Sequence, residues 1–274
     1  MHPESNATPP LLRHKAYEAP SVFTPENLLR EARRQKEVEE GRVPAVCLLD
    51  PDGDIVRNLR AAGRARKSRH WPCYHTDMYE FEHEGRTLGV VGRAVGGAFA
   101  VLVVEELFAM GCELLVSVTS SGQIHPMGNP PYFVLVDRAL RDEGTSYHYL
   151  PPSEFVHLDP RLRDGLAGAF EKSEVPVHAG ACWTTDAPFR ETEEAISAAR
   201  RLDILSVEME AAALYAFATA RDRPVVCFAH VTNQMATDAG DFEKGEADGS
   251  RDALRIVAMA VDALEKAGVP GEKL

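Results

Sequence analysis

Apolar and polar residues follow one another along this chain in a pattern that predicts short buried strands separated by helices. Seven apolar runs, each next to polar or turn-forming residues, have the length and branched side chains of buried strands. They are VPAVCLLD (43–50), TLGVVGRAV (87–95), ELLVSV (113–118), YFVLV (132–136), VPVHAGACW (175–183), LDILSV (202–207) and RPVVCFAHV (223–231).

Helical segments lie between these runs. FTPENLLREARRQKEVEE begins with Thr24, which can cap a helix, and Pro25, which is favoured at the first helical position. Further helices are expected in PDGDIVRNLRAAG, over residues 96–111, from Met209 onward, and from about Ser250 to Lys266. This alternation predicts an α/β layered fold with a largely parallel or mixed sheet. Residues 1–20 are polar and contain prolines, so we expect an irregular arm there and a single domain over 21–274.

Composition limits the classes of function. The chain is 45% hydrophobic with a net charge of −12, which argues against a nucleic-acid partner. Any anionic substrate must therefore meet locally placed cations or backbone N–H groups. Five scattered cysteines without a CxxC pair fit a reducing cytoplasm. The amino-terminal residues have no signal-peptide pattern, and acidic residues interrupt the longest apolar run, so we expect a cytoplasmic protein with no membrane partner. HWPCYHTD (70–77) matches no standard zinc spacing, and no metal is expected.

The predicted strand ends carry polar residues that could form a binding site, because ligands of open α/β sheets bind at the carboxyl ends of strands. These segments are Gly96-Gly97, Thr119 to Gly122, Thr184 to Asp186, Glu208 to Glu210, and Thr232 to Gln234. Each also has a purely structural interpretation. Gly96-Gly97 can cradle an anion or form a tight turn, TSSG can be a plain loop, TTDAPFRE can be a helix cap, and Asn233 can be a turn residue.

Glu208 and Glu210 are the least easily explained residues, because LSVEMEAAALYAFATA is otherwise built for burial. A buried carboxylate must find partners or take up a proton. Both acids precede a predicted helix, whose dipole favours the ionised form. An ionised Glu210 could accept two hydrogen bonds from vicinal sugar hydroxyls and stabilise an oxocarbenium-like sugar.

At this point the sequence resembles the nucleoside phosphorylases of the purine nucleoside phosphorylase and uridine phosphorylase superfamily. VEMEAAALY (207–215) matches the signature V-E-M-E-A-A-x-L-Y, and further segments of about residues 43–266 follow in the same order. They are LLDPDGDIV, AVGGAFAVLVVEEL, VSVTSSGQI, RDEGTSYHYL, VHAGACWTTDAPFRE and HVTNQ, and they look closer to the uridine phosphorylase branch.

The resemblance implies a twisted central mixed β-sheet flanked by helices in three layers, assembled as a homodimer or homohexamer. It implies cleavage of a nucleoside N-glycosidic bond with inorganic phosphate as co-substrate and no other cofactor; a sister group uses water. By position, Glu210 would bind the ribose 2′ and 3′ hydroxyls, Met209 would pack on the sugar and Glu208 would support the site. The residues implied near the base are Phe189, Asn233 and Gln234, and those implied in the anion pocket are Gly96, Gly97, Ser120, Ser121 and Gly122.

Several departures concern the phosphate. The family's Gly-Asp-Pro with its following arginine reads Leu49-Asp50-Pro51-Asp52-Gly53-Asp54 here, and the family's second arginine is Ser117. The region that supplies a neighbour's arginine has His70 and His75, and the uracil-reading glutamine-x-arginine pair is missing from TTDAPFRETEE. Arg93 could replace a phosphate arginine.

Three hypotheses follow. The first is a nucleoside phosphorylase with Glu210 and Asn233 as catalytic residues, the second is a nucleoside hydrolase on the same scaffold, and the third is a non-catalytic nucleoside-binding protein. Purine and pyrimidine bases both remain open.

Overall fold

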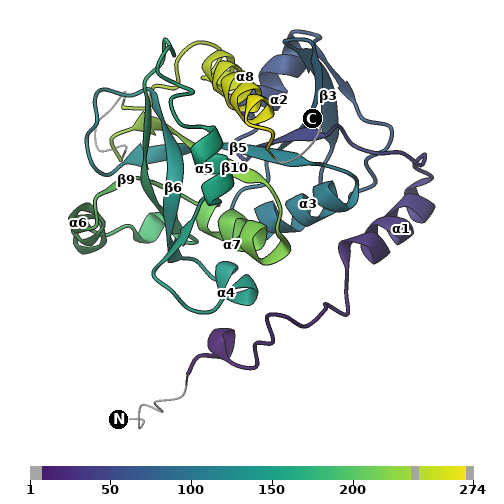
Figure 1. The fold of residues 1–274 in the computed structure, drawn as a ribbon, viewed down its shortest axis with the longest axis horizontal. Helices are drawn as coiled ribbons and strands as arrows, with labels where there is room; N and C mark the ends of the chain where they lie inside the picture. The colour runs from purple at the N-terminus through teal and green to yellow at the C-terminus, as the bar shows by residue number, and fades with distance from the viewer. Residues whose placement is uncertain (1–7, 236–240, 270–274) are drawn as a thin grey trace.

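The computed structural model describes residues 8–235 and 241–269, and its centre is a mixed β-sheet (Figure 1). Its strands are β1 (Val46–Asp50), β2 (Ala65–Lys67), β3 (Met78–His83), β4 (Arg86–Gly92), β5 (Leu114–Gln123), β6 (Tyr132–Asp142), β7 (Phe155–His157), β8 (Val177–Thr185), β9 (Ile204–Glu208) and β10 (Val225–Asn233). Its helices are α1 (Pro25–Lys36), α2 (Asp54–Ala61), α3 (Gly97–Ala109), α4 (Ser146–Tyr149), α5 (Pro160–Gly165), α6 (Glu193–Arg201), α7 (Ala211–Arg221) and α8 (Ser250–Lys266), with 3-10 turns η1 (Pro10–Leu12) and η2 (Pro188–Arg190).

The sheet contains a closed ring of strands. β5 pairs with β10, β10 with β6, β6 with β8, β8 with β9, and β9 with β5 again. β1, β4, β3 and β2 extend the sheet outward from β5. Parallel and antiparallel pairs both occur, so the predicted mixed α/β sheet is confirmed. The closure of the ring adds a feature that the sequence pattern did not indicate.

Helices cover both sides of this sheet. In Figure 1, α8 and α2 lie on one side, and α3, α7 and α4 lie on the other. Residues 211–217 of α7 are all buried, because this helix packs against α3, α4 and strands of the sheet. α8 has a buried apolar face and an exposed charged face, as its periodic sequence predicts.

Helix boundaries follow the capping signals in the sequence. The Thr24 side chain accepts a hydrogen bond from the Asn27 N–H at 3.3 Å, and Pro25 is the first residue of α1. The final helix spans the predicted residues. Some strands extend further than predicted: β5 continues through TSSGQ, which is therefore strand and not loop, and β6 continues to Asp142. The short strands β2 and β7 and the strand β3 were missed.

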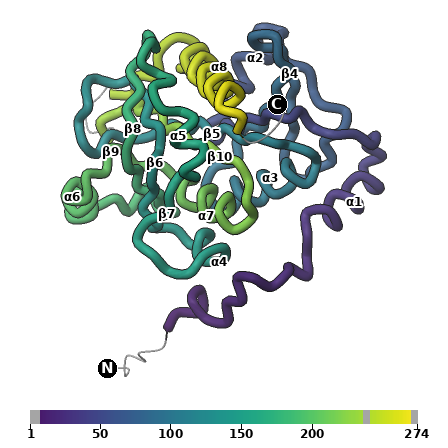
Figure 2. The backbone as a smooth tube through the Cα atoms, viewed as in Figure 1, coloured from purple at the N-terminus to yellow at the C-terminus, as the bar shows by residue number. Residues whose placement is uncertain are grey.

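The amino-terminal segment lies outside the layers and runs past α4 and α3 toward α1 (Figure 2). It contains the single turn η1, and the Lys15 ammonium lies 2.7 Å from Nδ1 of His148 on α4. The domain boundary at residue 20 stays a prediction. Within the described ranges, no helix is both long enough and apolar enough to cross a bilayer.

Candidate active site

The register of the ring brings together strand ends that are far apart in sequence. β8 places Thr184 opposite Glu208 of β9. β5 places Gly122 opposite Val207 on one side and opposite Asn233 of β10 on the other. The polar segments expected to converge at the strand ends therefore do meet.

Glu208 is buried and fully occupied by internal hydrogen bonds. Its Oε2 accepts from the backbone N–H groups of Glu210 at 2.7 Å and Ala211 at 2.8 Å, and its Oε1 accepts from the Thr184 hydroxyl. The Thr184 oxygen in turn accepts from the Ala212 N–H at 2.9 Å. The Glu208 side chain therefore caps the first turn of α7, a supporting role like the one the resemblance implied.

Glu210 is the residue immediately before α7 and is 1% exposed. Its Oε1 accepts a hydrogen bond from the Gly96 N–H at 2.7 Å. Its Oε2 is buried and has no hydrogen-bond partner among the described residues. The Thr119 hydroxyl donates instead to the Ser120 carbonyl, at 3.5 Å. A buried acceptor without a donor is costly, so this oxygen requires a hydrogen-bond donor that the described residues do not supply.

Burial sets the protonation of this pair. Desolvation and, to a smaller extent, the charge of Glu208 raise the pKa of Glu210 to about 8, against the opposing effect of the Gly96 N–H. Desolvation also raises the pKa of Glu208. The direction of both pKa shifts is opposite to the one that the helix dipole alone predicts, because burial outweighs the dipole.

Gly96 and Gly97 have a structural task as well as a place in the site. Gly96 has φ +87°, in the left-handed region that favours glycine, and its N–H is used by Glu210. A Cβ on Gly97 would lie 2.7 Å from Cβ of Ala213, so glycine lets α3 approach α7 closely. The predicted anion cradle thus has one of its N–H groups occupied by a carboxylate.

Ser120 is occupied in the same way. Its N–H donates to Oδ2 of Asp52 at 2.7 Å, and its hydroxyl donates to Oδ1 of Asp52 at 2.8 Å. The Asp52 carboxylate therefore occupies the N–H and the hydroxyl of Ser120, which were expected to bind an anion. Ser121 faces the other side of β5, where its hydroxyl is buried and has no partner among the described residues.

The turn that carries Asp52 is strongly acidic. Asp50 accepts hydrogen bonds from the N–H groups of Gly53 and Val56 at 3.1 and 2.9 Å. Desolvation, together with the charges of Asp52 and Asp54, raises the pKa of Asp50 to about 7. Asp54 forms ion pairs with Arg57 at 2.7 Å and with Lys244 at 2.6 Å. Asp52 forms no salt bridge with a described residue, so its charge would repel a phosphate dianion placed beside this turn.

The residues expected at the base have mixed positions. Asn233 is buried, its Nδ2 donates to the Ser121 carbonyl and the Thr232 hydroxyl, and its Oδ1 accepts from the Met235 N–H at 2.9 Å. It therefore shapes the strand end before any ligand binds. The Gln234 side chain is exposed, and its N–H donates to the Asp241 carboxylate. Met209 is half-buried between the two glutamates.

Two predicted site residues lie outside this cluster. Phe189 is 99% exposed in η2, and its placement against a base stays a prediction. Arg93 is also exposed and has φ 66°. Its side chain lies over Gly53, where an added Cβ would be 2.8 Å from Arg93 Cγ.

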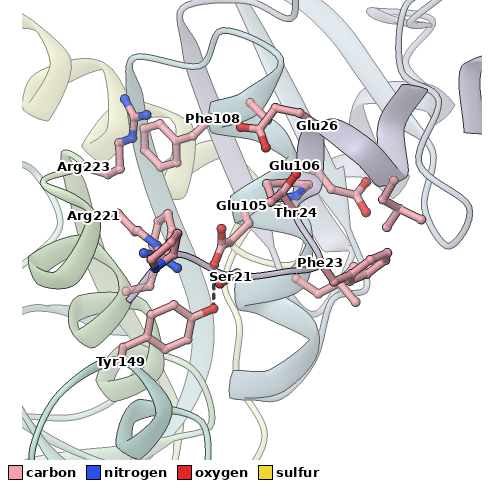
Figure 3. A pocket seen from close by; sticks show the side chains of 16 residues that line it. Ser21, Phe23, Thr24, Glu26, Glu105, Glu106, Phe108, Tyr149, Arg221 and Arg223 are labelled. Carbon is pink, nitrogen blue, oxygen red and sulfur yellow. Dashed lines mark hydrogen bonds between the residues drawn. The ribbon is translucent and has the colours of Figure 1, made fainter. Parts of the chain in front are cut away.

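The cavity shown in Figure 3 is a different feature, with a volume of about 450 Å³. It lies between the segment from Pro20 to Leu28, α3 and α7, and the Tyr149 hydroxyl donates to Glu105 across it at 2.7 Å. None of the residues predicted for the site lines this cavity. Among the described residues, no group of histidine, cysteine and acidic side chains is arranged to hold a metal ion.

Sequence reasoning missed three supporting residues. Thr184 orients Glu208, Asp52 fixes Ser120, and the buried Glu143 carboxylate lies near Gly97 while accepting from the Thr145 and Ser146 N–H groups. Thr184 stood in a segment already singled out at a strand end, and Asp52 stood in the altered Gly-Asp-Pro segment. Glu143 gave one signal, an acid placed directly before the turn residues Gly144 and Thr145.

The chain is an α/β protein with a closed ring of strands and two buried glutamates at the strand ends. Comparison with known proteins gives its family. A model of the phosphorylase superfamily matches residues 39–264, so the chain belongs to that superfamily. It is similar to a guanosine phosphorylase of Halorubrum lacusprofundi, with 27% identity over 83% of this chain and 97% of the relative. It is also similar to a uridine phosphorylase of Thermococcus kodakarensis, with 26% identity over 83% of this chain and 87% of the relative.

Solved structures agree on the fold. A uridine phosphorylase from Vibrio fischeri superposes with a TM-score of 0.66 and 18% identity, over 85% of this chain and 93% of that one. A 5′-methylthioadenosine/S-adenosyl homocysteine nucleosidase from Campylobacter jejuni superposes with a TM-score of 0.64 and 15% identity, over 81% and 99%. At these identities the likeness confirms the fold alone.

Proposed function

We propose that this protein is an enzyme that cleaves the N-glycosidic bond of a ribonucleoside. The observation that carries the proposal is the buried Oε2 of Glu210, which has no partner among the described residues while Oε1 is fixed by Gly96. A vicinal diol supplies the hydroxyl donors that this carboxyl group lacks. The membership of the phosphorylase superfamily and the names of its relatives support this substrate class.

The protonation of Glu210 fits this chemistry. Its pKa is about 8, so the carboxyl holds a proton over much of the neutral range. Hydroxyl donors from ribose favour the ionised form, and ionisation then places negative charge beside the sugar. That charge stabilises the positive charge which develops on the ribose as the bond to the base breaks. Asn233 lies across Gly122 from this cluster, at a place where a reoriented amide could meet the leaving base.

For the acceptor of the sugar we propose water. Asp52 occupies the N–H and the hydroxyl of Ser120, which are donors that an attacking phosphate would need. The same carboxylate can accept a proton from water as the oxygen attacks C1′. The bond from C1′ to the base nitrogen breaks, its electron pair leaves with the base, and the base takes up a proton. The products are a free base and free ribose.

Phosphorolysis is the second candidate. It is favoured by the curated relatives, whose names are guanosine phosphorylase and uridine phosphorylase. In that case phosphate would have to displace Asp52 from Ser120, and Arg93 is the exposed cation nearest in sequence to the Gly96 turn. The products would be a free base and ribose 1-phosphate.

One experiment separates these possibilities. A panel of purine and pyrimidine nucleosides is incubated with the protein in buffers with and without phosphate, and free base and sugar products are measured by chromatography. Base release in both buffers with free ribose supports hydrolysis, and release that depends on phosphate supports the second candidate. If every nucleoside is recovered unchanged and a nucleoside raises the melting temperature, the result supports the hypothesis of a non-catalytic nucleoside-binding protein. The matched variant is E210Q, which should lose base release.

A further inference from the structure

A second cavity, lined with arginines, lies on the other side of the acidic turn. Its volume is about 540 Å³, within the range of small-molecule sites. It is formed by the Gly53 turn, one face of α2, the segment leading into β3 and the end of β4, and its charged or titratable lining residues are Arg57, Arg60, His75, Asp77 and Arg93. Tyr79 forms part of its wall.

The turn separates this cavity from the carboxylates. A small cavity of about 20 Å³ on the other side is lined by Asp50, Asp52, Asp54 and Ser120, and the two cavities share no lining residue. Gly53, with φ +80°, lies on the arginine side. The acids that would repel an anion at Ser120 therefore do not line the arginine cavity.

The ion pairs within the described residues leave a net positive charge in this cavity. Arg57 is paired with Asp54 at 2.7 Å and Asp248 at 2.8 Å. Asp77 is paired with Lys67 at 2.7 Å. Arg60 and Arg93 form no salt bridge with any described residue, so two positive charges face the cavity uncompensated.

Both uncompensated arginines are exposed, and each side chain lies against a part of the fold. Arg60 lies over the ring of the buried Tyr79, 4.8 Å from its centroid. Arg93 has a left-handed backbone, and its side chain folds back over Gly53. A guanidinium group presents its N–H donors at its edges, which suits the oxygens of phosphate. In a protein with a net charge of −12, a dianion is bound where such local charge overcomes the overall field.

We propose that this arginine cavity binds a phosphate dianion, through Arg60 and Arg93, at a site separate from Ser120. The dianion can come from free phosphate or from the phosphoryl group of a phosphorylated ligand such as a nucleoside 5′-monophosphate. The cavity is large enough for either. Arg93 is three residues from Gly96, which donates to Glu210, so a bound anion lies on the loop that leads into the candidate active site.

Binding is tested by isothermal titration calorimetry of the full chain with inorganic phosphate. R60Q and R93Q should each weaken binding at least about tenfold, and the double variant should abolish it, because each removes a charge-assisted contact. R66Q is the matched control: Arg66 lies on β2 beside Glu80, is 77% exposed and does not line the cavity. It should bind phosphate like the wild type.

The two sources are distinguished by titrating a nucleoside and its 5′-monophosphate. If the cavity takes the phosphoryl group of a ligand, the monophosphate binds more tightly than the nucleoside, and R60Q and R93Q remove the difference. If it takes free phosphate, the nucleoside and its monophosphate bind alike. The proposal is overturned if phosphate shows no saturable binding to the wild type, or if R60Q and R93Q bind it as R66Q does. None of these titrations requires turnover, so their failure is distinct from a failure of the nucleoside panel.

Discussion

Replacing Glu210 by glutamine should stabilise the protein increasingly as the pH rises, while it removes activity. The pKa of Glu210 is about 8 in the folded protein, against an ordinary value of 4.5. Between these values the unfolded chain releases the proton and the folded chain keeps it. The free energy of unfolding of the wild type therefore falls with rising pH through this window, by up to about 1.4 kcal/mol per pH unit. Above pH 8 the loss is complete.

The magnitude follows from the two pKa values. Integrated from pH 5 to pH 8, the shift corresponds to about 3 kcal/mol of stability that the wild type loses through this group. E210Q has no titrating group at this position and should not show that loss. A buried N–H of its amide left unsatisfied costs about 1–3 kcal/mol, and this offset is the same at every pH. The change with pH is therefore the diagnostic quantity.

The assay is urea denaturation of the wild type and E210Q at pH 5, 6.5 and 8, followed by circular dichroism. E193Q is the control, because Glu193 is exposed at the start of α6 and should follow the wild type. Base release by E210Q is measured in parallel and should be lost. A stability difference between wild type and E210Q that is the same at all three pH values would refute the reasoning that burial holds a proton on Glu210.

Other predictions concern the groups around this residue. Thr184→Val removes the hydroxyl that joins Glu208 to the Ala212 N–H and should lower the free energy of unfolding by about 1–3 kcal/mol in urea denaturation; an unchanged midpoint would contradict that link. Gly97→Ala should cost about 1–3 kcal/mol because its Cβ meets Ala213, and A213G in the same chain should restore part of the melting temperature. Asp52→Asn should slow base release about 100-fold or more in phosphate-free buffer if this carboxylate is the base for water, and an unaffected rate would exclude that role.

Helix-capping residues and regular apolar periodicity predicted the secondary-structure elements well where these signals were strong. Thr24 and Pro25 fix the start of α1, and the apolar periodicity fixes α8 over Ser250 to Lys266. The signature around Glu208 and Glu210 indicated the fold family and the residues that meet at the strand ends. The two carboxyl groups occur in a segment whose apolar pattern predicts burial. Charged side chains in such a segment often mark a functional site.

Contacts between distant segments could not be predicted. Asp52 and Ser120 are 68 residues apart, and nothing in either motif shows that one would occupy the donors of the other. The direction of Phe189 depends on how the turn at Pro188 leaves β8. The proton on Glu210 depends on the total desolvation of the site, and the helix position alone suggested the opposite sign.

The ring formed by β5, β10, β6, β8 and β9 also bears on self-association. A strand with an unpaired edge can template pairing with another chain, and closing the ring removes most such edges. In the described sheet the outermost strands are β2 and β7, each three residues long, and β2 carries the exposed Arg66 and Lys67. Strands this short offer little backbone for another strand to dock on, and the charges of β2 oppose docking further. Concentrated samples of this protein should therefore resist fibril formation for as long as the ring stays intact.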